Sequence, residues 1–90
     1  MTMISVVIPN WNGADELPDC LNSLLAQSQK HEIIVVENGS TDTSKELLYG
    51  QYPDVRVIPL PSNTGFAGGV NTGLRYAAAA GHEYTALLNN

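Results

Sequence analysis

The stretch NTGFAGGVNTG, residues 63–73, carries four glycines and two asparagines around a single phenylalanine. Glycine has no Cβ atom, so a ligand or another segment can approach its backbone closely. Backbone N–H groups at the start of a helix also attract anionic groups such as phosphates. We therefore predict that Gly65 and Gly68 admit a ligand, and that Gly73 lets a helix pack closely on a sheet.

A second candidate is Glu37, which ends the apolar run EIIVVE and precedes the turn residues NGSTD. A carboxylate at the end of a strand can accept hydrogen bonds from a sugar hydroxyl or from a base N–H. The same position also suits a solvated acid beside the start of the next helix. Position alone leaves both interpretations open.

Two common phosphate-binding motifs are absent from the sequence. The segment PNWNGAD holds one glycine, so it does not match the dinucleotide fingerprint G-x-G-x-x-G. Gly68 and Gly73 have the spacing of the outer glycines of a P-loop. However, Leu74 and Arg75 stand where that motif needs Lys and Ser or Thr.

Hydrolytic and metal-dependent chemistry also lacks its residues. His31 and His82 each precede an expected strand, and we interpret both as surface residues of connectors. Ser5 and Ser40 have no histidine within the expected reach, so a Ser-His-Asp arrangement is not supported. No cluster of His, Cys, Asp and Glu has the spacing of a metal site. We therefore predict no catalytic residue and no metal ligand in these residues.

Composition narrows the class of protein. The 90 residues are enough for one domain, and 43% are hydrophobic, which supports a folded core. The net charge of −5 argues against a nucleic-acid partner, which needs a basic face. Cys20 is the only cysteine and is expected as a buried thiol. Neither a signal peptide nor an apolar run long enough for a membrane span is recognisable.

Four short apolar runs predict β-strands, each bounded by proline, glycine or polar residues. They cover about residues 3–8, 32–37, 55–60 and 84–88. Helical periodicity occupies the segments between them, which predicts an α/β fold of order βαβαβαβ with a three-layer, parallel sheet. We expect the strand order 3-2-1-4, with the third strand less buried because Arg56 interrupts it.

The helices have predicted caps and faces. Asn12 is expected to cap the first helix, Pro18 to lie in its first turn, and Thr43 and Glu46 to form a capping box on the second. The buried face of the first helix is predicted to hold Leu17, Cys20, Leu21, Leu24 and Leu25. That of the third is predicted to hold Phe66, Val70, Leu74, Ala77 and Ala78.

Ligands of open parallel sheets bind beyond the carboxyl ends of the strands. The loops expected at that end concentrate asparagine, glycine and Glu37, whereas the connectors at the other end are plainer. With these loops in place, the sequence resembles an inverting glycosyltransferase of family 2 with a GT-A fold, whose first part is Rossmann-like. The resemblance is carried by SVVIPNWNG, LPDCLNSLLAQ, IIVVENGSTD, NTGFAGGVNTGL and ALLNN, and GFAGGVNTG is most similar to the rhamnosyltransferase-like branch.

The resemblance implies a binding site for the nucleotide of a sugar donor. The residues that match it are Pro9, Asn10, Trp11, Glu37, Asn38, Ser40, Asn63, Gly65, Phe66, Ala67, Gly68 and Asn71. Asp42 also matches, although a helix cap would explain it equally well. Glu37 replaces the usual aspartate, and its extra methylene affects base preference. Because its carboxylate could accept the imino N–H of uracil or thymine, a UDP- or dTDP-sugar is favoured.

The family's Asp-x-Asp motif, which holds a divalent metal, follows the segment that LLNN matches. Residues 1–90 are therefore expected to be the N-terminal, donor-nucleotide-binding part of a cytoplasmic enzyme of polysaccharide or cell-surface glycan synthesis, truncated before that motif and inactive alone. Mg²⁺ or Mn²⁺ is expected only in the full-length enzyme. The alternatives are a flavodoxin-like interaction module without catalysis and a divergent dinucleotide-binding half-domain. An unprotected edge strand at residues 84–88 predicts a homo-oligomer.

Overall fold

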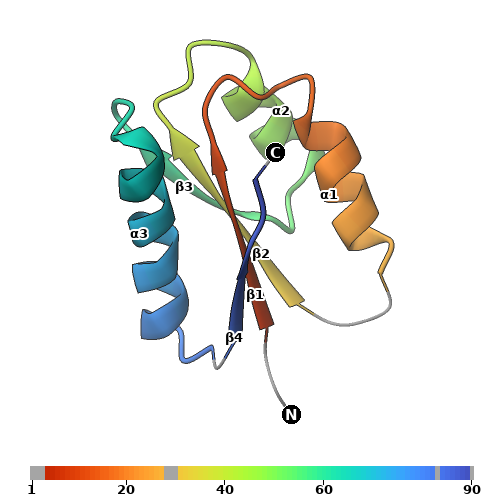
Figure 1. The fold of residues 1–90 in the computed structure, drawn as a ribbon. Helices are drawn as coiled ribbons and strands as arrows, with labels where there is room; N and C mark the ends of the chain where they lie inside the picture. The colour runs from red at the N-terminus through yellow and green to blue at the C-terminus, as the bar shows by residue number, and fades with distance from the viewer. Residues whose placement is uncertain (1–3, 28–30, 83, 90) are drawn as a thin grey trace.

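The computed structural model describes residues 4–27, 31–82 and 84–89. Strands and helices alternate along the chain in the order β1 (Ile4–Asn10), α1 (Leu17–Leu25), β2 (His31–Asn38), α2 (Ser44–Gln51), β3 (Arg56–Leu60), α3 (Gly65–Ala79) and β4 (Tyr84–Leu87). The strands form one parallel sheet in the order β3-β2-β1-β4, as predicted. Helices α1 and α2 cover one face of the sheet and α3 covers the other (Figure 1).

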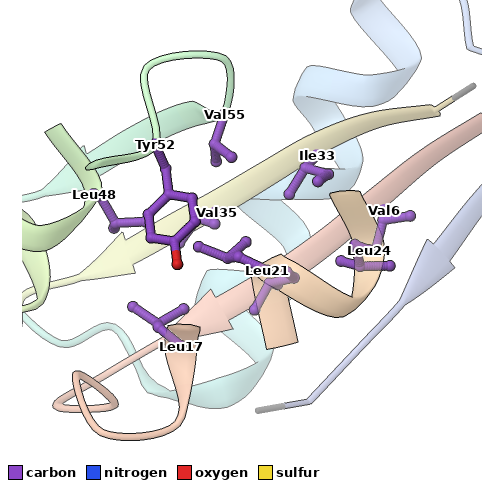
Figure 2. Packing of buried hydrophobic residues seen from close by; sticks show 10 residues of the cluster. Val6, Leu17, Leu21, Leu24, Ile33, Val35, Leu48, Tyr52 and Val55 are labelled. Atoms are coloured by element: carbon purple, nitrogen blue, oxygen red, sulfur yellow. The ribbon is translucent and has the colours of Figure 1, made fainter. Parts of the chain in front are cut away.

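The alternation of side chains along β1 and β2 divides the core in two. Val6, Ile8, Ile33 and Val35 pack against leucines of α1 and α2, and Figure 2 shows part of this cluster. On the other face, alternate residues of the same strands, among them Val7, Ile34 and Val36, pack against α3.

Strand β1 runs to Asn10, two residues beyond the predicted end, and includes Pro9. Pro9 lies opposite Val36 of β2. Val7 accepts a hydrogen bond from Leu88 on the β4 side, so Pro9, two residues later, also faces that side. Pairing with β4 ends at Val7, so the missing N–H of Pro9 breaks no bond of the sheet.

Helix α1 begins later than predicted. Asn12 is not its cap, because the helix starts at Leu17 after a turn, with Glu16 in the cap position. Pro18 lies in the first turn, as predicted. The buried face holds Leu17, Leu21 and Leu24, with the half-buried Cys20 beside them. Burial raises the pKa of the Cys20 thiol. Leu25 is 52% exposed, so its predicted burial is wrong.

The buried face of α3 consists of small residues, Gly69, Gly73 and Ala77. A Cβ atom at Gly73 would collide with side chains of Val7 and Val36, which confirms the packing role predicted for this glycine. Of the predicted apolar face, Ala77 is buried, whereas Phe66 and Leu74 are exposed. The prediction failed because it weighted large apolar residues, while close contact between helix and sheet selects residues without side-chain bulk.

Both edge strands are more exposed than the central pair. In β3 the exposure begins at Arg56, whose guanidinium lies 5.6 Å from the centre of the Tyr76 ring. All four residues of β4 are exposed, and Tyr84 is 61% exposed. Within the described residues, no helix is long and apolar enough to cross a membrane.

The amino end of the sheet contains a polar cluster that was not predicted. The side chain of His82 is 8% exposed, so its interpretation as a surface residue is wrong. Its Nδ1 is hydrogen-bonded to Ser5 Oγ, and its Nε2 lies 3.8 Å from a carboxylate oxygen of Glu32. Ser5 therefore does have a histidine within reach. Because Ser5 is completely buried, the pair is closed to substrates.

Candidate functional site: a groove at the carboxyl end of the sheet

A groove of about 250 Å³ opens at the carboxyl ends of β1 and β2, beside the start of α3. Its lining residues are Pro9, Asn10, Trp11, Asn38, Asn63, Gly65, Phe66 and Asn89. All of these except Asn89 were predicted as site residues. The fold therefore brings three separate segments of the predicted site into one hollow.

Five of the predicted residues do not line this groove: Glu37, Ser40, Ala67, Gly68 and Asn71. Ala67 and Asn71 lie on α3 and are exposed. Gly68 also lies within this helix rather than in a loop, and a Cβ atom there would come within 2.5 Å of the Thr64 hydroxyl. The absence of a side chain at Gly68 thus has a structural reason that needs no ligand.

The expectation that Glu37 offers its carboxylate to a base is not met, because the side chain is completely buried. Along β2, Ile33 and Val35 point toward α1 and α2, and Glu37 continues that row. Asn38, the next residue, points to the α3 face and lines the groove. The alternation of side chains along a strand was the signal in the sequence that places Glu37 and Asn38 on opposite faces of the sheet.

Glu37 instead holds two loops together from inside. Its Oε1 accepts a hydrogen bond from Asn10 Nδ2 at 3.0 Å and another from Ser40 Oγ. Its Oε2 accepts a bond from the Ser40 backbone N–H at 3.2 Å. A buried carboxylate needs such donors to offset its desolvation. The end of β1 is thereby fixed to the turn after β2.

Asn12 joins the same two loops from outside. Its φ of 52° lies in the left-handed region, which asparagine tolerates better than most residues. Its Oδ1 accepts bonds from the backbone N–H groups of Thr41 at 2.8 Å and Asp42 at 3.2 Å. Its own N–H donates to Ser40 Oγ at 2.9 Å. The role of Asn12 was missed because its position before a helix also suits a cap.

Asp42 completes this junction and starts α2. Its Oδ1 accepts a bond from the Ser44 N–H at 2.9 Å, and its Oδ2 accepts one from the Ala14 N–H at 3.1 Å. Burial raises the pKa of Asp42, but hydrogen bonds from Ser44 and Ala14 outweigh this effect and lower it overall. Thr43 occupies the cap position as predicted, yet its side chain makes no capping bond.

Asn38 fixes the start of α3 to the end of β2. Its Oδ1 accepts hydrogen bonds from the Thr64 N–H and hydroxyl, both at 2.9 Å, and its Nδ2 donates to the Gly65 carbonyl at 2.9 Å. Gly65 has a φ of 80°, which a residue with a side chain adopts only with strain. Its N–H donates to Asn63 Oδ1 at 2.7 Å. The conformation of the loop from Asn63 to Gly65 is therefore set by one asparagine of β2 and one of the loop itself.

Two aromatic side chains remain exposed among these fixed loops. Trp11 is 55% exposed and Phe66 is 57% exposed, and both line the groove. Exposed aromatic rings beside amide groups suit a flat, partly polar ligand, because one ring stacks while amides form hydrogen bonds.

A metal does not fit the residues that the structure describes. Among them, no group of three or more His, Cys, Asp or Glu side chains could hold an ion. A larger hollow, of about 530 Å³, lies beside α2 and the start of β3. It contains none of the predicted site residues, so the smaller groove is the better candidate.

Comparison with known proteins matches almost all of the chain to one family. The family model for glycosyl transferase family 2 matches residues 5–90. An uncharacterized glycosyltransferase, alr2836, of Nostoc sp. (strain PCC 7120) is 42% identical over 96% of this chain and 27% of the relative. Poly-beta-1,6-N-acetyl-D-glucosamine synthase of Staphylococcus aureus (strain MW2) is 32% identical over 96% of this chain and 21% of the relative.

Solved structures agree with the fold. TarS 1-349 of S. aureus, in complex with UDP-GlcNAc, superposes with a TM-score of 0.84 at 25% identity, over 99% of this chain and 26% of that one. Mannosyltransferase PcManGT from Pyrobaculum calidifontis, in complex with GDP-Man and Mn²⁺, gives 0.70 at 26% identity, over 82% of this chain and 24% of that one. The fold is thus one found in GT-A glycosyltransferases, of which this chain covers about a quarter.

The chain spans only about a quarter to a third of the length of the first curated relatives that it matches. The family model, in contrast, covers almost all of the chain. The chain belongs to glycosyl transferase family 2.

Proposed function

We propose that residues 1–90 bind the nucleotide of a sugar donor, as part of a glycosyltransferase that transfers the sugar to an acceptor hydroxyl. The observation that carries the proposal is the groove at the carboxyl ends of β1 and β2, where Trp11 and Phe66 lie beside four asparagines. Structures of the neighbour TarS in complex with UDP and with UDP-GlcNAc support a nucleotide sugar as the ligand class.

In this proposal the base lies against Trp11, and the exposed side chains of Asn63 and Asn89 form its polar contacts. The buried Asn10 and Asn38 set the shape of the groove. Glu37 acts from behind the groove, where it holds Asn10 and Ser40 in place. This role replaces the direct base contact expected from the sequence, and with it the argument for a pyrimidine. UDP remains the first choice because of the TarS complexes, and dTDP the second because thymine differs from uracil by one methyl group.

The wider setting also belongs to the proposal. The relative that makes poly-beta-1,6-N-acetyl-D-glucosamine supports a role in polysaccharide or cell-surface glycan synthesis. Nucleotide sugars are cytosolic, which supports a cytoplasmic site of action. We propose that a divalent metal, Mg²⁺ or Mn²⁺, serves the whole enzyme through residues outside this chain, and that residues 1–90 do not catalyse transfer alone.

Titration of the chain with UDP tests nucleotide binding. Trp11 is the only tryptophan, so quenching of its fluorescence reports a base stacked at the groove. UDP should quench in the millimolar range or below, whereas NAD, included as the dinucleotide, should bind more weakly. dTDP and GDP, run in parallel, define the base preference. If calorimetry detects no heat and the fluorescence does not change with any nucleotide, the proposal fails and the interaction-module alternative gains support.

We also propose that copies of this chain associate through β4. Tyr84, Leu87 and Leu88 are exposed, and β4 is an edge of the sheet. Leu88 donates its N–H to Val7, so by alternation the N–H groups of Thr85 and Leu87 point outward and are available for strand pairing. Sedimentation at tens of micromolar should give a dimer or larger species, and Thr85→Pro should give a monomer. A monomeric unmodified chain would contradict this proposal.

A further inference from the structure

Trp11 is held by its neighbours rather than by its own packing. Its side chain is more than half exposed, yet the residue before it and the residue after it are both fixed to the turn that follows β2. Asn10 donates to the buried Glu37, and Asn12 bonds to residues 40–42. An exposed ring between two fixed residues loses less conformational entropy when a ligand stacks on it.

The two residues that flank Trp11 differ in burial. Asn10 is completely buried and ends β1, so the sheet also holds it. Asn12 is exposed and lies beyond the strand, with a left-handed backbone. The path of the backbone at Asn12 therefore depends on the side-chain bonds to Thr41 and Asp42 and on the bond from the Asn12 N–H to Ser40.

We infer that Asn12 is a positioning residue, which holds the Trp11 indole in the orientation that a nucleobase requires. The inference rests on the proposed nucleotide-binding function and adds to it a residue that does not line the groove. Asn12 orients the loop between β1 and α1, and Trp11 provides the contact surface. Without the Asn12 acceptor, the loop can move. The Trp11 ring is then still present, but it is no longer held in one orientation.

Two substitutions separate the acceptor from the backbone requirement. Asn12→Gly keeps the left-handed φ without strain but removes the acceptor of the Thr41 and Asp42 bonds. Asn12→Asp keeps an acceptor oxygen and also tolerates that φ. Ser5→Ala is the matched control, because it removes a buried hydrogen bond at the opposite end of the sheet.

Time-resolved fluorescence anisotropy of Trp11 gives a readout that does not need a ligand. In the free protein, Asn12→Gly should enlarge the fast, local part of the anisotropy decay by about twofold. Asn12→Asp and Ser5→Ala should keep the decay of the unmodified chain. Ser5→Ala also loses a hydrogen bond and some stability, but at the other end of the sheet. If Trp11 moves faster in Asn12→Gly and not in Ser5→Ala, the cause is therefore local and not a general loss of stability. Equal decays for Asn12→Gly and the unmodified chain would overturn the inference.

UDP titration adds the functional arm. Asn12→Gly should weaken UDP binding about two- to threefold by calorimetry, which is less than the loss expected when the ring itself is removed, and Asn12→Asp should restore most of that loss. Unchanged UDP affinity in Asn12→Gly would overturn the inference even if the anisotropy changed. If the unmodified chain binds no nucleotide, the proposed function fails, and the anisotropy arm alone then decides whether Asn12 positions Trp11.

Discussion

Two glutamates of strand β2 lie at opposite ends of the sheet and are treated differently. Glu37, at the carboxyl end, is completely buried and accepts hydrogen bonds from Asn10 and Ser40. Glu32, at the amino end, has one oxygen 3.8 Å from His82. Its other oxygen is buried without a hydrogen-bond partner among the described residues. The groove therefore lies at the end of the sheet where both oxygens of the buried glutamate have hydrogen-bond partners.

This difference indicates which end of the sheet is held more rigidly by polar contacts. At the carboxyl end, Glu37, Asn12 and Asn38 each join segments that are distant in sequence, and the exposed aromatics lie between these junctions. At the amino end, His82 contacts Ser5 of β1 and Glu32 of β2, and none of these three is a predicted binding residue. Fixed polar junctions around an open groove are expected of a binding site that is largely pre-formed.

The largest expected effect comes from Glu37→Ala. The substitution leaves Asn10 Nδ2 and the Ser40 N–H without their buried acceptor, and each such loss costs about 1–3 kcal/mol. The free energy of unfolding in urea, followed by circular dichroism, should fall by about 3 kcal/mol. Glu32→Ala, on the same strand, should change it by less than about 1 kcal/mol, because its contact with His82 is 3.8 Å long and its side chain is partly exposed. Equal losses would break the comparison.

The features of the fold and of the candidate site that the sequence predicts are those that depend on residues close together in the chain. The strands and the carboxyl-end location of the groove follow from short apolar runs and turn residues, which are local signals. The strand order is not a local property, and its prediction depended on the GT-A topology. The burial of Glu37 could also have been predicted, because it continues the row of Ile33 and Val35. The bond between Ser5 and His82 could not, because it joins residues 77 positions apart, on an end of the sheet without a local signal.

The second effect concerns the start of α3. Asn38→Ala removes an acceptor for two donors of Thr64 and a donor to the Gly65 carbonyl, so the free energy of unfolding should fall by about 2 kcal/mol. Ser5→Ala, which removes one bond at the amino end, should cost about 1 kcal/mol. Amide exchange of Thr64 and Gly65 should accelerate in Asn38→Ala alone. Faster exchange at these amides in Ser5→Ala would show that the two ends are coupled.

A third comparison is functional. Trp11→Ala removes an exposed ring from the groove and should weaken UDP binding by about 1 kcal/mol, or roughly fivefold, by calorimetry. Stability should hardly change, because the ring is more than half exposed. His82→Ala should have the reverse profile, with lower stability and unchanged UDP affinity. If His82→Ala weakened UDP binding as much as Trp11→Ala, the groove would not be confined to the carboxyl end.

The smallest effect is the pH dependence contributed by Asp42. Hydrogen bonds from Ser44 and Ala14 lower its pKa in the folded chain, despite the opposing effect of burial. A carboxyl with a lowered folded pKa contributes stability above its unfolded value of about 3.9, and this contribution is lost as the pH falls through the folded pKa. Carbon NMR titration of the Asp42 carboxyl should therefore give a midpoint below the ordinary aspartate value. In Asp42→Asn, which cannot titrate, the free energy of unfolding should decline less between pH 5 and pH 3 than in the unmodified chain. Identical declines would mean that the bonds of Asp42 to Ser44 and Ala14 do not favour its charged form over its neutral form, so that Asp42 joins the loops without contributing a pH dependence.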